Sequence, residues 1–483
     1  MADQSSVTSP EQTLAQQLGE FAATVARDGV PEDVARSVVQ RVVDVLGLCV
    51  AAHVLPTSKA AIGYAVDAGG AERATAVGVG RRLPAPAAAF VNGVLAHSLD
   101  YDDTHLPSVL HPSANVVPAA LAAAEDAGAS GEDVVRAIAV GLEVAVRLGM
   151  AGYDEKLGNS VFFEHGQHAT SICGAMGAAV AAAMVQGLDA DGVVHSLGLA
   201  ASRASGILEA NRTGGTVKRL HCGWAAEAGV AAAQLVKRGF TGPPSVLEGR
   251  FGFFEAWLHG SRIDYDAVSV GLGTEWAVPG IFFKPYPANH FTHAAVDAGI
   301  ELRERGVRPD DIVRLELGVP AAAQRTIGQP IEVKRAPYTG YQAQFSGPYA
   351  LVAGLLGGGG LGVALSDYTD ALAQDPQRRA LMAKVDVVAD PECDEIFPHQ
   401  FPAKVVAELT DGRTEHVAIL ANRGGPQRPL SDEELAVKFR ENASGELAGP
   451  VVNDIEVRLR DLRSMTSLDE LMSLFVPTSA PRA

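Results

Sequence analysis

Residues 97–105, HSLDYDDTH, hold three aspartates and two histidines within nine positions. The rest of the chain is dominated by alanine, glycine and valine, so ionisable groups are rarely this concentrated in it. A further histidine, His111, follows shortly after and opens the sequence HPS. Three interpretations are open for this stretch: a metal site, an acid/base cluster, or a solvated loop without chemistry.

An acid/base cluster explains this composition best. Magnesium would need further hard oxygen ligands, but no additional aspartate follows DDTH and no phosphate-binding glycine loop accompanies it. Iron or zinc would need two histidines and a carboxylate, which this stretch contains, so the metal site stays open as an alternative. Close carboxylates raise one another's pKa and histidine titrates near neutral pH, which suits proton transfer. We therefore predict acid/base chemistry without a metal.

A second cluster lies in FFEHGQHATS, where His165 and His168 precede an Ala/Gly-rich segment that is predicted to be helical. A histidine at a helix N-terminus feels the positive end of the dipole, which favours the neutral, proton-accepting imidazole. The same helix start offers free N–H groups to an anion. We interpret His168 as a functional residue and His165 as a surface or capping residue.

Two basic segments follow, GGTVKRLHCGWAAEAG and FFKPYPANHFTHAA. The first places Lys218, Arg219 and His221 after two glycines, whose backbone allows a carboxylate to approach closely. Arginine suits bidentate carboxylate binding, and lysine acts as a point charge. The second places Lys284 beside a stiff Pro-Tyr-Pro turn, with His290 beyond it. Cations gathered in an acidic chain are consistent with a small polycarboxylate substrate.

The overall composition excludes several classes of partner. The chain has 483 residues and a formal net charge of −18, so it repels nucleic acid and anionic membrane surfaces. Its four cysteines form no CxxC pair, as is typical of a reducing cytoplasm. The opening MADQSSVTSPEQ lacks the basic and apolar regions of a secretory signal. We expect a cytoplasmic protein.

The order of sequence patterns predicts a mainly α fold with two domains. Helical patterns rich in alanine and glycine fill residues 1–270, which favours a large all-helical domain. Residues 271–423 alternate like strands in DIVRLELGV, KVDVVAD and the hairpin AKVVAELTDGRTEHVAIL, so a smaller α+β domain is predicted there. Helical patterns return over 424–483, which makes the first domain discontinuous.

Six ordered motifs resemble those of the MmgE/PrpD family, which includes 2-methylcitrate dehydratase, cis-aconitate decarboxylase and iminodisuccinate epimerase. They are AHSLDYDDTH, HPSANVVPAALAAAE, GQHATSICGAMGAAVAAA, GTVKRLHCGWAAEAG, FTGPPSVLEG and KPYPANHFTHAAVDA. The resemblance covers nearly the whole chain. It implies an all-helical domain, an α+β lid, an active site between them, a homodimer, and neither cofactor nor metal.

The resemblance also implies a set of site residues, carried over position by position. The catalytic positions are Asp100, His111, His168, Lys218 and Lys284. Thr104 is carried over in the same way as a substrate contact, and we also expect substrate contacts from Arg219, His221, Tyr153, Asn289 and His290. Some positions depart from the family pattern. Gln167 and Ala169 replace the usual aromatic residue and proline beside His168, and His290 stands where arginine is common. Asn289 stands where the decarboxylases carry histidine, which counts against decarboxylation.

The reactions of this family share the movement of a proton at a carbon next to a carboxylate, and cations placed in advance stabilise the developing charge. We expect Lys218, Arg219 and Lys284 to neutralise substrate carboxylates. One of His111 and His168 would move the carbon proton, the other would serve the leaving hydroxyl, and Asp100 would orient a histidine. A closing lid would exclude water.

Dehydration of a 2-methylcitrate-like hydroxy acid is the predicted reaction. Epimerisation of an iminodisuccinate-like dicarboxylate is an alternative, and it would need a second base, such as Tyr153, on the opposite face of the substrate. Decarboxylation of a cis-aconitate type of substrate is another. More remote alternatives are a metal-dependent enzyme and a carboxylate-binding protein without catalysis.

Overall fold

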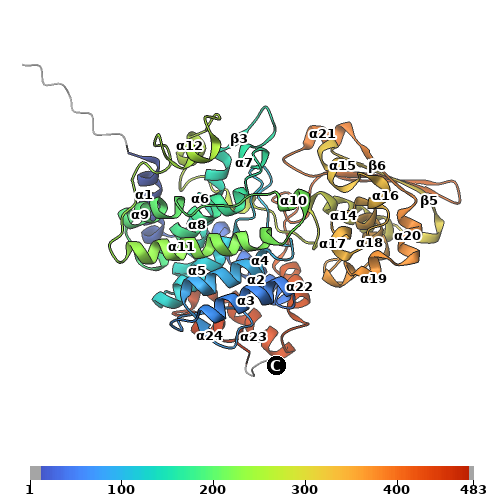
Figure 1. Cartoon of the computed structure of the whole chain (residues 1–483). Helices are drawn as coiled ribbons and strands as arrows, with labels where there is room; N and C mark the ends of the chain where they lie inside the picture. The colour runs from blue at the N-terminus through green and yellow to red at the C-terminus, as the bar shows by residue number, and fades with distance from the viewer. Residues whose placement is uncertain (1–11, 478–483) are drawn as a thin grey trace, which may run out of the picture.

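The computed structural model describes residues 12–477, whose helices and strands build two large hydrophobic cores (Figure 1). Residues 14–281 and 439–475 form the first, which we call the helical core. Residues 286–419 form the second, which we call the mixed core. Residues 1–11, on which the prediction of no secretory signal largely rests, lie outside the described residues.

The helical core is a bundle of helices around the apolar helix α8, which packs against α5, α6, α9 and α11. Its long helices are α1 (Leu14–Asp28), α2 (Glu32–Ala52), α3 (Pro56–Ala68), α4 (Ala85–His97), α5 (Ser113–Ala127), α6 (Gly131–Ala151), α8 (Ala169–Val185), α9 (Ala190–Ala201) and α11 (His221–Val236). Shorter helices connect them: α7 (Val161–Glu164), α10 (Ala210–Thr213), the 3-10 turns η1 (Val217–Leu220) and η2 (Val278–Gly280), α12 (Phe253–Leu258) and α13 (Asp266–Ser269). The prediction of a mainly α fold is confirmed.

Two very short strand pairs in this part of the chain were not predicted. β1 (Ala74–Thr75) pairs with β2 (Arg82–Leu83), and β3 (Tyr153–Asp154) pairs with β4 (Asn159–Ser160), both antiparallel. Strands of two residues are too short to show the alternation of apolar and polar residues on which strand prediction depends.

Close helix contacts explain why this core is rich in alanine and glycine. A Cβ atom on Gly177 of α8 would lie 2.3 Å from the carbonyl oxygen of Gly141 on α6. A Cβ atom on Gly223 of α11 would lie 2.5 Å from the carbonyl oxygen of Phe90 on α4. Only glycine permits these approaches. The second contact packs the start of α11 against the middle of α4, the helix that ends at His97.

The mixed core is a four-stranded sheet covered by helices, in the order β6-β5-β7-β8. β5 pairs parallel with β6 and antiparallel with β7, and β7 pairs antiparallel with β8. The helices α14 and α18 pack on each other, and α14 contacts β7 and β8. The elements that carry this core are α14 (His293–Glu304), β5 (Ile312–Val319), α18 (Gly347–Leu356), β6 (Val385–Ala389), β7 (Ala403–Leu409) and β8 (Thr414–Ile419).

The predicted hairpin is confirmed, because β7 and β8 flank Asp411 and Gly412, and Gly412 takes a positive φ of 86°. The shorter helices of this part are η3 (His290–Thr292), η4 (Pro309–Asp311), α15 (Ala321–Ile327), α16 (Ile331–Lys334), α17 (Gly340–Ala343), η5 (Leu365–Asp367), α19 (Asp370–Ala373), α20 (Pro376–Met382) and α21 (Pro391–Ile396).

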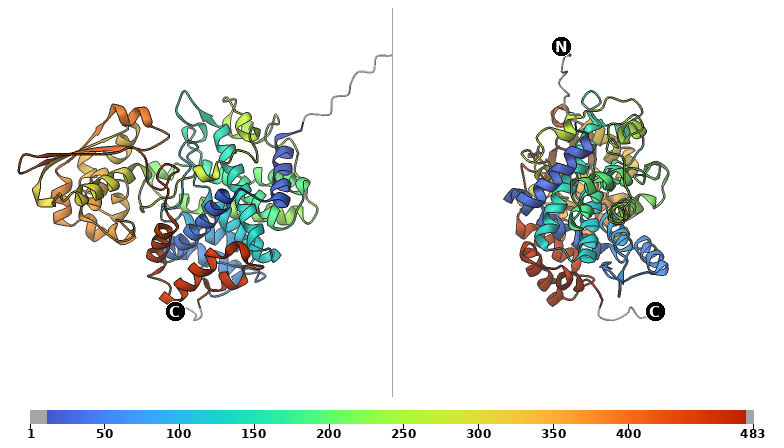
Figure 2. Two further views of the ribbon diagram at one scale, coloured as in Figure 1. Left: turned by 180° about the vertical axis from the view of Figure 1, so that it is seen from behind. Right: turned by 90° about the vertical axis from the view of Figure 1, so that its left-hand side faces the viewer.

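The last helices return to the helical core, beside the N-terminal helices (Figure 2). They are α22 (Asp432–Ala443), α23 (Gly449–Arg460), η6 (Leu462–Ser464) and α24 (Asp469–Ser473). Ser431 and Glu434 form a capping box at the start of α22. α22 packs on α2, where the Lys438 ammonium lies 2.6 Å from the Asp44 carboxylate.

The mixed core begins at Tyr286, later than the predicted domain boundary at residue 271, because Val278 and Ile281 pack in the helical core. Within residues 12–477, no single helix is long and apolar enough to cross a membrane. The pair α2 and α3 meets that criterion only when taken together, and these helices are bent by 96° relative to each other.

A buried arginine joins three parts of the helical core beneath the acidic stretch. Arg41 of α2 is 1% exposed and lies 2.7 Å from the carboxylate of Asp103. The same guanidinium donates to the carbonyl oxygens of Val278 (3.0 Å) and Ile281 (2.8 Å). Asp103 in turn accepts from Ser113 at the start of α5. Arg41 therefore holds both the acidic stretch and the segment that leads to Lys284.

Replacing Arg41 by alanine is expected to lower the free energy of unfolding by about 3–5 kcal/mol, because the buried Asp103 carboxylate would lose its counter-charge. Arg36 of the same helix is the matched control. It pairs with Asp432, but the two side chains are 62% and 65% exposed, so Arg36→Ala should cost less than about 1 kcal/mol. Chemical denaturation followed by circular dichroism compares the variants. Equal losses would contradict the role assigned to Arg41.

Candidate active site

A short backbone bridge brings the acidic stretch against the segment that carries Lys284. Thr104 and Phe282 each donate their backbone N–H to the other's carbonyl oxygen, both at 2.8 Å. Two residues beyond Phe282, the Lys284 side chain reaches back to Asp100. The phenol of Tyr101 donates to the carbonyl oxygen of Pro285 at 2.9 Å and fixes the same approach. The site therefore forms where the chain leaves the helical core for the mixed core.

The Asp100 carboxylate lies between two lysine ammonium groups. Its Oδ1 is 3.2 Å from Lys284 Nζ and 3.8 Å from Lys218 Nζ. Lys284 Nζ also donates to the Asp100 carbonyl oxygen at 2.7 Å, an arrangement that goes with the left-handed backbone of Asp100 (φ 52°). An ammonium group has three donors, so each lysine retains capacity for a second anion. The Asp100 carboxylate therefore joins Lys218, which lies in η1 just before α11, to Lys284.

These opposite charges stabilise each other. Burial would raise the pKa of Asp100, but Lys284 and Lys218 together hold it well below its usual range. Burial would lower the pKa of Lys218, and Asp100 raises it overall. Both groups are therefore charged at neutral pH. The structure gives Asp100 lysine partners, so the expected orientation of a histidine by Asp100 was wrong.

A hydrogen bond to a backbone carbonyl oxygen fixes the tautomer of His111. Its Nδ1 lies 2.7 Å from the carbonyl oxygen of Asp103 and 3.3 Å from Thr104 Oγ1. A carbonyl oxygen can only accept, so Nδ1 carries the proton and Nε2 of the neutral ring is free to accept one. Burial, opposed by Asp102 and reinforced by Lys284, lowers the pKa of His111 to about 4. His111 is therefore neutral at physiological pH.

His168 lies at the N-cap of α8, as the sequence predicted, and contacts a second imidazole. Its Nδ1 is 2.9 Å from Nδ1 of His221, the first residue of α11. The backbone N–H of His168 donates to the Gly206 carbonyl oxygen at 3.0 Å. Burial and then the charge of Lys218 lower the pKa of His168 well below its usual value. Burial lowers the pKa of His221 to about 4.

The imidazole rings form a connected row. The centroid of His97 is 5.3 Å from that of His111 and 5.7 Å from that of His168, which is 5.0 Å from that of His221. His97 is also bonded through Nδ1 to the carboxylate of Asp102 at 2.7 Å. His97 and Asp102 were not among the predicted site residues, although both lie in the opening acidic stretch. Their spacing of five positions gives no signal on its own.

The mixed core contributes His290, whose ring lies between Phe282 and Phe401, with centroids 5.9 and 5.5 Å away. His290 is 5% exposed, and neither of its ring nitrogens has a hydrogen-bond partner among the described residues. Burial, followed by His293 and Lys284, lowers the pKa of His290 well below its usual value. Asn289 beside it uses its side-chain oxygen to accept from the Phe291 N–H at 3.1 Å. Its amide therefore caps η3.

Two predicted substrate contacts, Arg219 and Tyr153, make no hydrogen bond to these histidines in the described part of the chain. Arg219 donates to Thr57 Oγ1 at 3.1 Å, and its guanidinium lies 5.9 Å from the ring centre of Tyr341 in α17. Tyr153 lies in the β3–β4 pair, and its pKa is raised by burial and by its neighbours Glu155 and Asp154. Arg219 therefore lies against α17, and the charged neighbours of Tyr153 come from its own β3–β4 turn.

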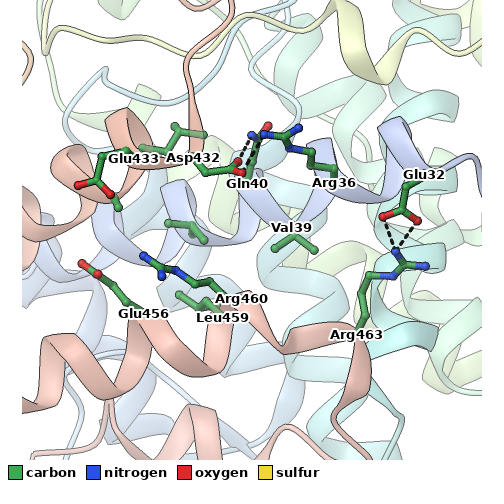
Figure 3. A pocket seen from close by; sticks show the side chains of 13 residues that line it. Glu32, Arg36, Val39, Gln40, Asp432, Glu433, Glu456, Leu459, Arg460 and Arg463 are labelled. Atoms are coloured by element: carbon green, nitrogen blue, oxygen red, sulfur yellow. Dashed lines mark hydrogen bonds and ion pairs between the residues drawn. The ribbon is translucent and has the colours of Figure 1, made fainter.

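Two hollows of the surface are lined by other residues. The larger, of about 660 Å³, lies between α2, α22 and α23 (Figure 3). Four of its charged groups are tied to each other, since Arg463 pairs with Glu32 and Arg36 with Asp432. The smaller, of about 360 Å³, is lined by residues that include Phe21 and Trp276. In the described part of the chain, no three His, Cys, Asp or Glu side chains converge in a metal-binding arrangement.

Curated proteins similar to this chain include decarboxylases and a dehydratase, which are lyases. Human cis-aconitate decarboxylase is 31% identical over 83% of this chain and 81% of its own length. The cis-aconitate decarboxylase of Aspergillus terreus is 26% identical over 100% of both chains. The mitochondrial 2-methylcitrate dehydratase of Yarrowia lipolytica is 26% identical over 35% of this chain and 31% of its own length.

Two family models together span most of the chain. The MmgE/PrpD N-terminal domain matches residues 16–266, and the MmgE/PrpD C-terminal domain matches residues 286–459. The resemblance seen in the sequence motifs is thereby confirmed. This chain belongs to the MmgE/PrpD family.

Proposed function

We propose that this protein is a lyase that acts on a small polycarboxylate by removing a proton from a carbon next to a carboxylate. The observation that carries the proposal is the neutral His111, whose Nε2 can accept a proton, beside two lysines that share Asp100. A carbon acid of this kind becomes more acidic when its developing negative charge meets preplaced cations. Lys218 and Lys284 supply those cations.

Dehydration is the reaction that these groups support best. His111 Nε2 takes the proton from carbon, the electron pair of the C–H bond forms a double bond, and the hydroxyl group leaves with the C–O electron pair. The proton passes to the leaving hydroxyl to give water, and we assign His168 the role of hydrogen-bonding that oxygen. Lys218 and Lys284 hold substrate carboxylates. We propose a 2-methylcitrate-like hydroxy acid as substrate.

Decarboxylation of a cis-aconitate-like substrate is the second candidate, because the human decarboxylase matches over 83% of this chain. That reaction must deliver a proton to carbon when carbon dioxide leaves. Asn289, at the position where decarboxylases carry histidine, has an amide that caps η3 and cannot act as an acid. His111 and His168 are held neutral, which suits accepting a proton. These points favour dehydration.

Turnover of a panel of di- and tricarboxylates in deuterated water tests the proposal. We expect loss of water from a 2-methylcitrate-like acid, with deuterium entering at the carbon that exchanges. Release of carbon dioxide from cis-aconitate would favour the second candidate, and exchange without net reaction would indicate an epimerase. Binding without exchange, or activity that follows added metal, would overturn the proposed chemistry.

His111→Gln should slow proton exchange at the substrate carbon by at least about 10²-fold, the usual contribution of a general base. His105→Gln is the matched control. His105 lies in the same stretch and bonds Ser108 at 2.7 Å, so its loss removes an imidazole without touching the proposed base. Mass spectrometry of the recovered substrate measures both rates. Exchange by His111→Gln at the parental rate would remove that residue from the mechanism.

Lys284→Met should raise the dissociation constant of a tricarboxylate such as citrate by roughly 10- to 100-fold, because a charge-assisted hydrogen bond contributes about 1.5–3 kcal/mol. Lys237→Met is its control, since Lys237 is exposed at the far end of α11. Titration calorimetry measures both constants, and thermal unfolding checks that each variant is folded. Unchanged affinity in folded Lys284→Met would show that this lysine does not hold the substrate.

A further inference from the structure

Two histidines of the mixed core, His290 in η3 and His293 at the start of α14, have no part in the proposed reaction so far. They are 5% and 1% exposed, and their ring centroids lie 4.6 Å apart. Both ring nitrogens of His290 and Nδ1 of His293 have no hydrogen-bond partner among the described residues. Buried polar groups without a partner are rare in folded proteins. Three such nitrogens on two adjacent rings therefore indicate a group that these rings bind.

The side chains packed around these rings do not supply the missing hydrogen bonds. Phe282 and Phe401 flank His290, with ring centroids 5.9 and 5.5 Å away, and a phenylalanine side chain has neither donor nor acceptor. The ring of Tyr286 lies 5.4 Å from that of His293, but its hydroxyl already donates to a carboxylate of α14. The partner of the free nitrogens is therefore a group that these walls do not provide.

The two histidines lie beside the junction between the acidic stretch and the mixed core. Phe282, whose ring packs against His290, exchanges backbone hydrogen bonds with Thr104. Thr104 in turn lies 3.3 Å from the ring of the proposed base. Lys284 and Asp100 are among the groups whose charges act on both rings. A ligand held by the two lysines is therefore in the neighbourhood of these nitrogens.

The hydrogen-bonding capacity of the two rings follows from their partners. His293 Nε2 lies 3.2 Å from the carbonyl oxygen of Ala288, which can only accept, so Nε2 carries the proton and Nδ1 is an acceptor. Neither ring is bonded to a carboxylate in the described part of the chain, and a buried cation without a counter-charge is costly. Both rings are therefore neutral, and His290 has one donor and one acceptor.

This set of one donor and two acceptors selects an uncharged group. A carboxylate only accepts, so it would use the single N–H of His290 and leave both acceptor nitrogens facing its negative charge. A hydroxyl group accepts one hydrogen bond and donates another, so it matches the two rings. Burial lowers the pKa of His293 to about 3, which agrees with a neutral acceptor at this position.

We propose that His290 and His293 form a subsite for the hydroxyl group of the substrate. The N–H of His290 donates to the hydroxyl oxygen, and the hydroxyl donates its hydrogen to His293 Nδ1. A hydroxyl oxygen has two lone pairs, so one stays open for the hydrogen bond assigned to His168. The inference rests on the proposed function, because it identifies what recognises the leaving group of that reaction.

Citrate and propane-1,2,3-tricarboxylate differ only in one hydroxyl group, so their relative affinity tests the subsite. We expect the parent protein to bind citrate roughly 10-fold more tightly, as two neutral hydrogen bonds predict. In His290→Phe this preference should fall below about 2-fold, because the donor to the hydroxyl is lost. The dissociation constant of propane-1,2,3-tricarboxylate should change by less than about 3-fold, since its carboxylates bind elsewhere. Titration calorimetry measures these constants.

His290→Phe should fold, because phenylalanine resembles the aromatic walls and removes two nitrogens that lack partners. Its unfolding temperature should not lie below that of the parent. His416→Phe is the matched control, since His416 is exposed on β8 of the same core, and it should keep the preference for citrate. If His290→Phe does not fold, His290→Met removes the same nitrogens and should lose the preference in the same way.

Equal affinity of the parent for the two acids would overturn the inference, and a bound water would then be the partner of these nitrogens. A preference for citrate that persists in folded His290→Phe would overturn it as well. A preference that disappears in the variant, in a protein that removes no proton from its ligands in deuterated water, would contradict the proposed function and support the subsite. Loss of water from a hydroxy acid, with the preference unchanged in the variant, would contradict the subsite alone.

Discussion

The carboxylate of Asp100, placed between the ammonium groups of Lys218 and Lys284, is the contact on which the site depends. It draws the turn before α11 and the segment that leads to the mixed core onto one point of the acidic stretch. Without Asp100, the buried Lys284 and the half-buried Lys218 would repel each other beside neutral imidazoles. With it, each lysine has a counter-charge beside it and a donor left for an anionic ligand.

Buried ion pairs beneath the site hold the acidic stretch in place. Arg41 with Asp103 ties it to α2, and Lys438 of α22 pairs with Asp44 of α2. Lys438 also donates to the carbonyl oxygen of Tyr101, and its ammonium lies 3.9 Å from that ring's centre. These ion pairs fix the position of the acidic stretch relative to α2 and α22, because a buried charge is stable only beside its partner. The returning C-terminal helix therefore contributes to the site's geometry.

Local patterns predicted most of the fold, whereas the site was only partly predictable. The hairpin around Asp411-Gly412 and the capping box at Ser431 are encoded by neighbouring residues, so the sequence alone suffices for them. Clusters of ionisable residues in the sequence were enough to select Lys218, Lys284 and His111 as candidate site residues. Pairing depends on tertiary packing, however: the sequence did not reveal that Asp102, rather than Asp100, bonds a histidine.

A crystal structure with propane-1,2,3-tricarboxylate, which has no hydroxyl group to lose, tests the central claim most directly. The account predicts carboxylate oxygens of this ligand within hydrogen-bond distance of Lys218 Nζ and Lys284 Nζ, with one of its carbons facing His111 Nε2. A ligand bound instead in the groove between α2, α22 and α23, or one that contacts neither lysine, would contradict it.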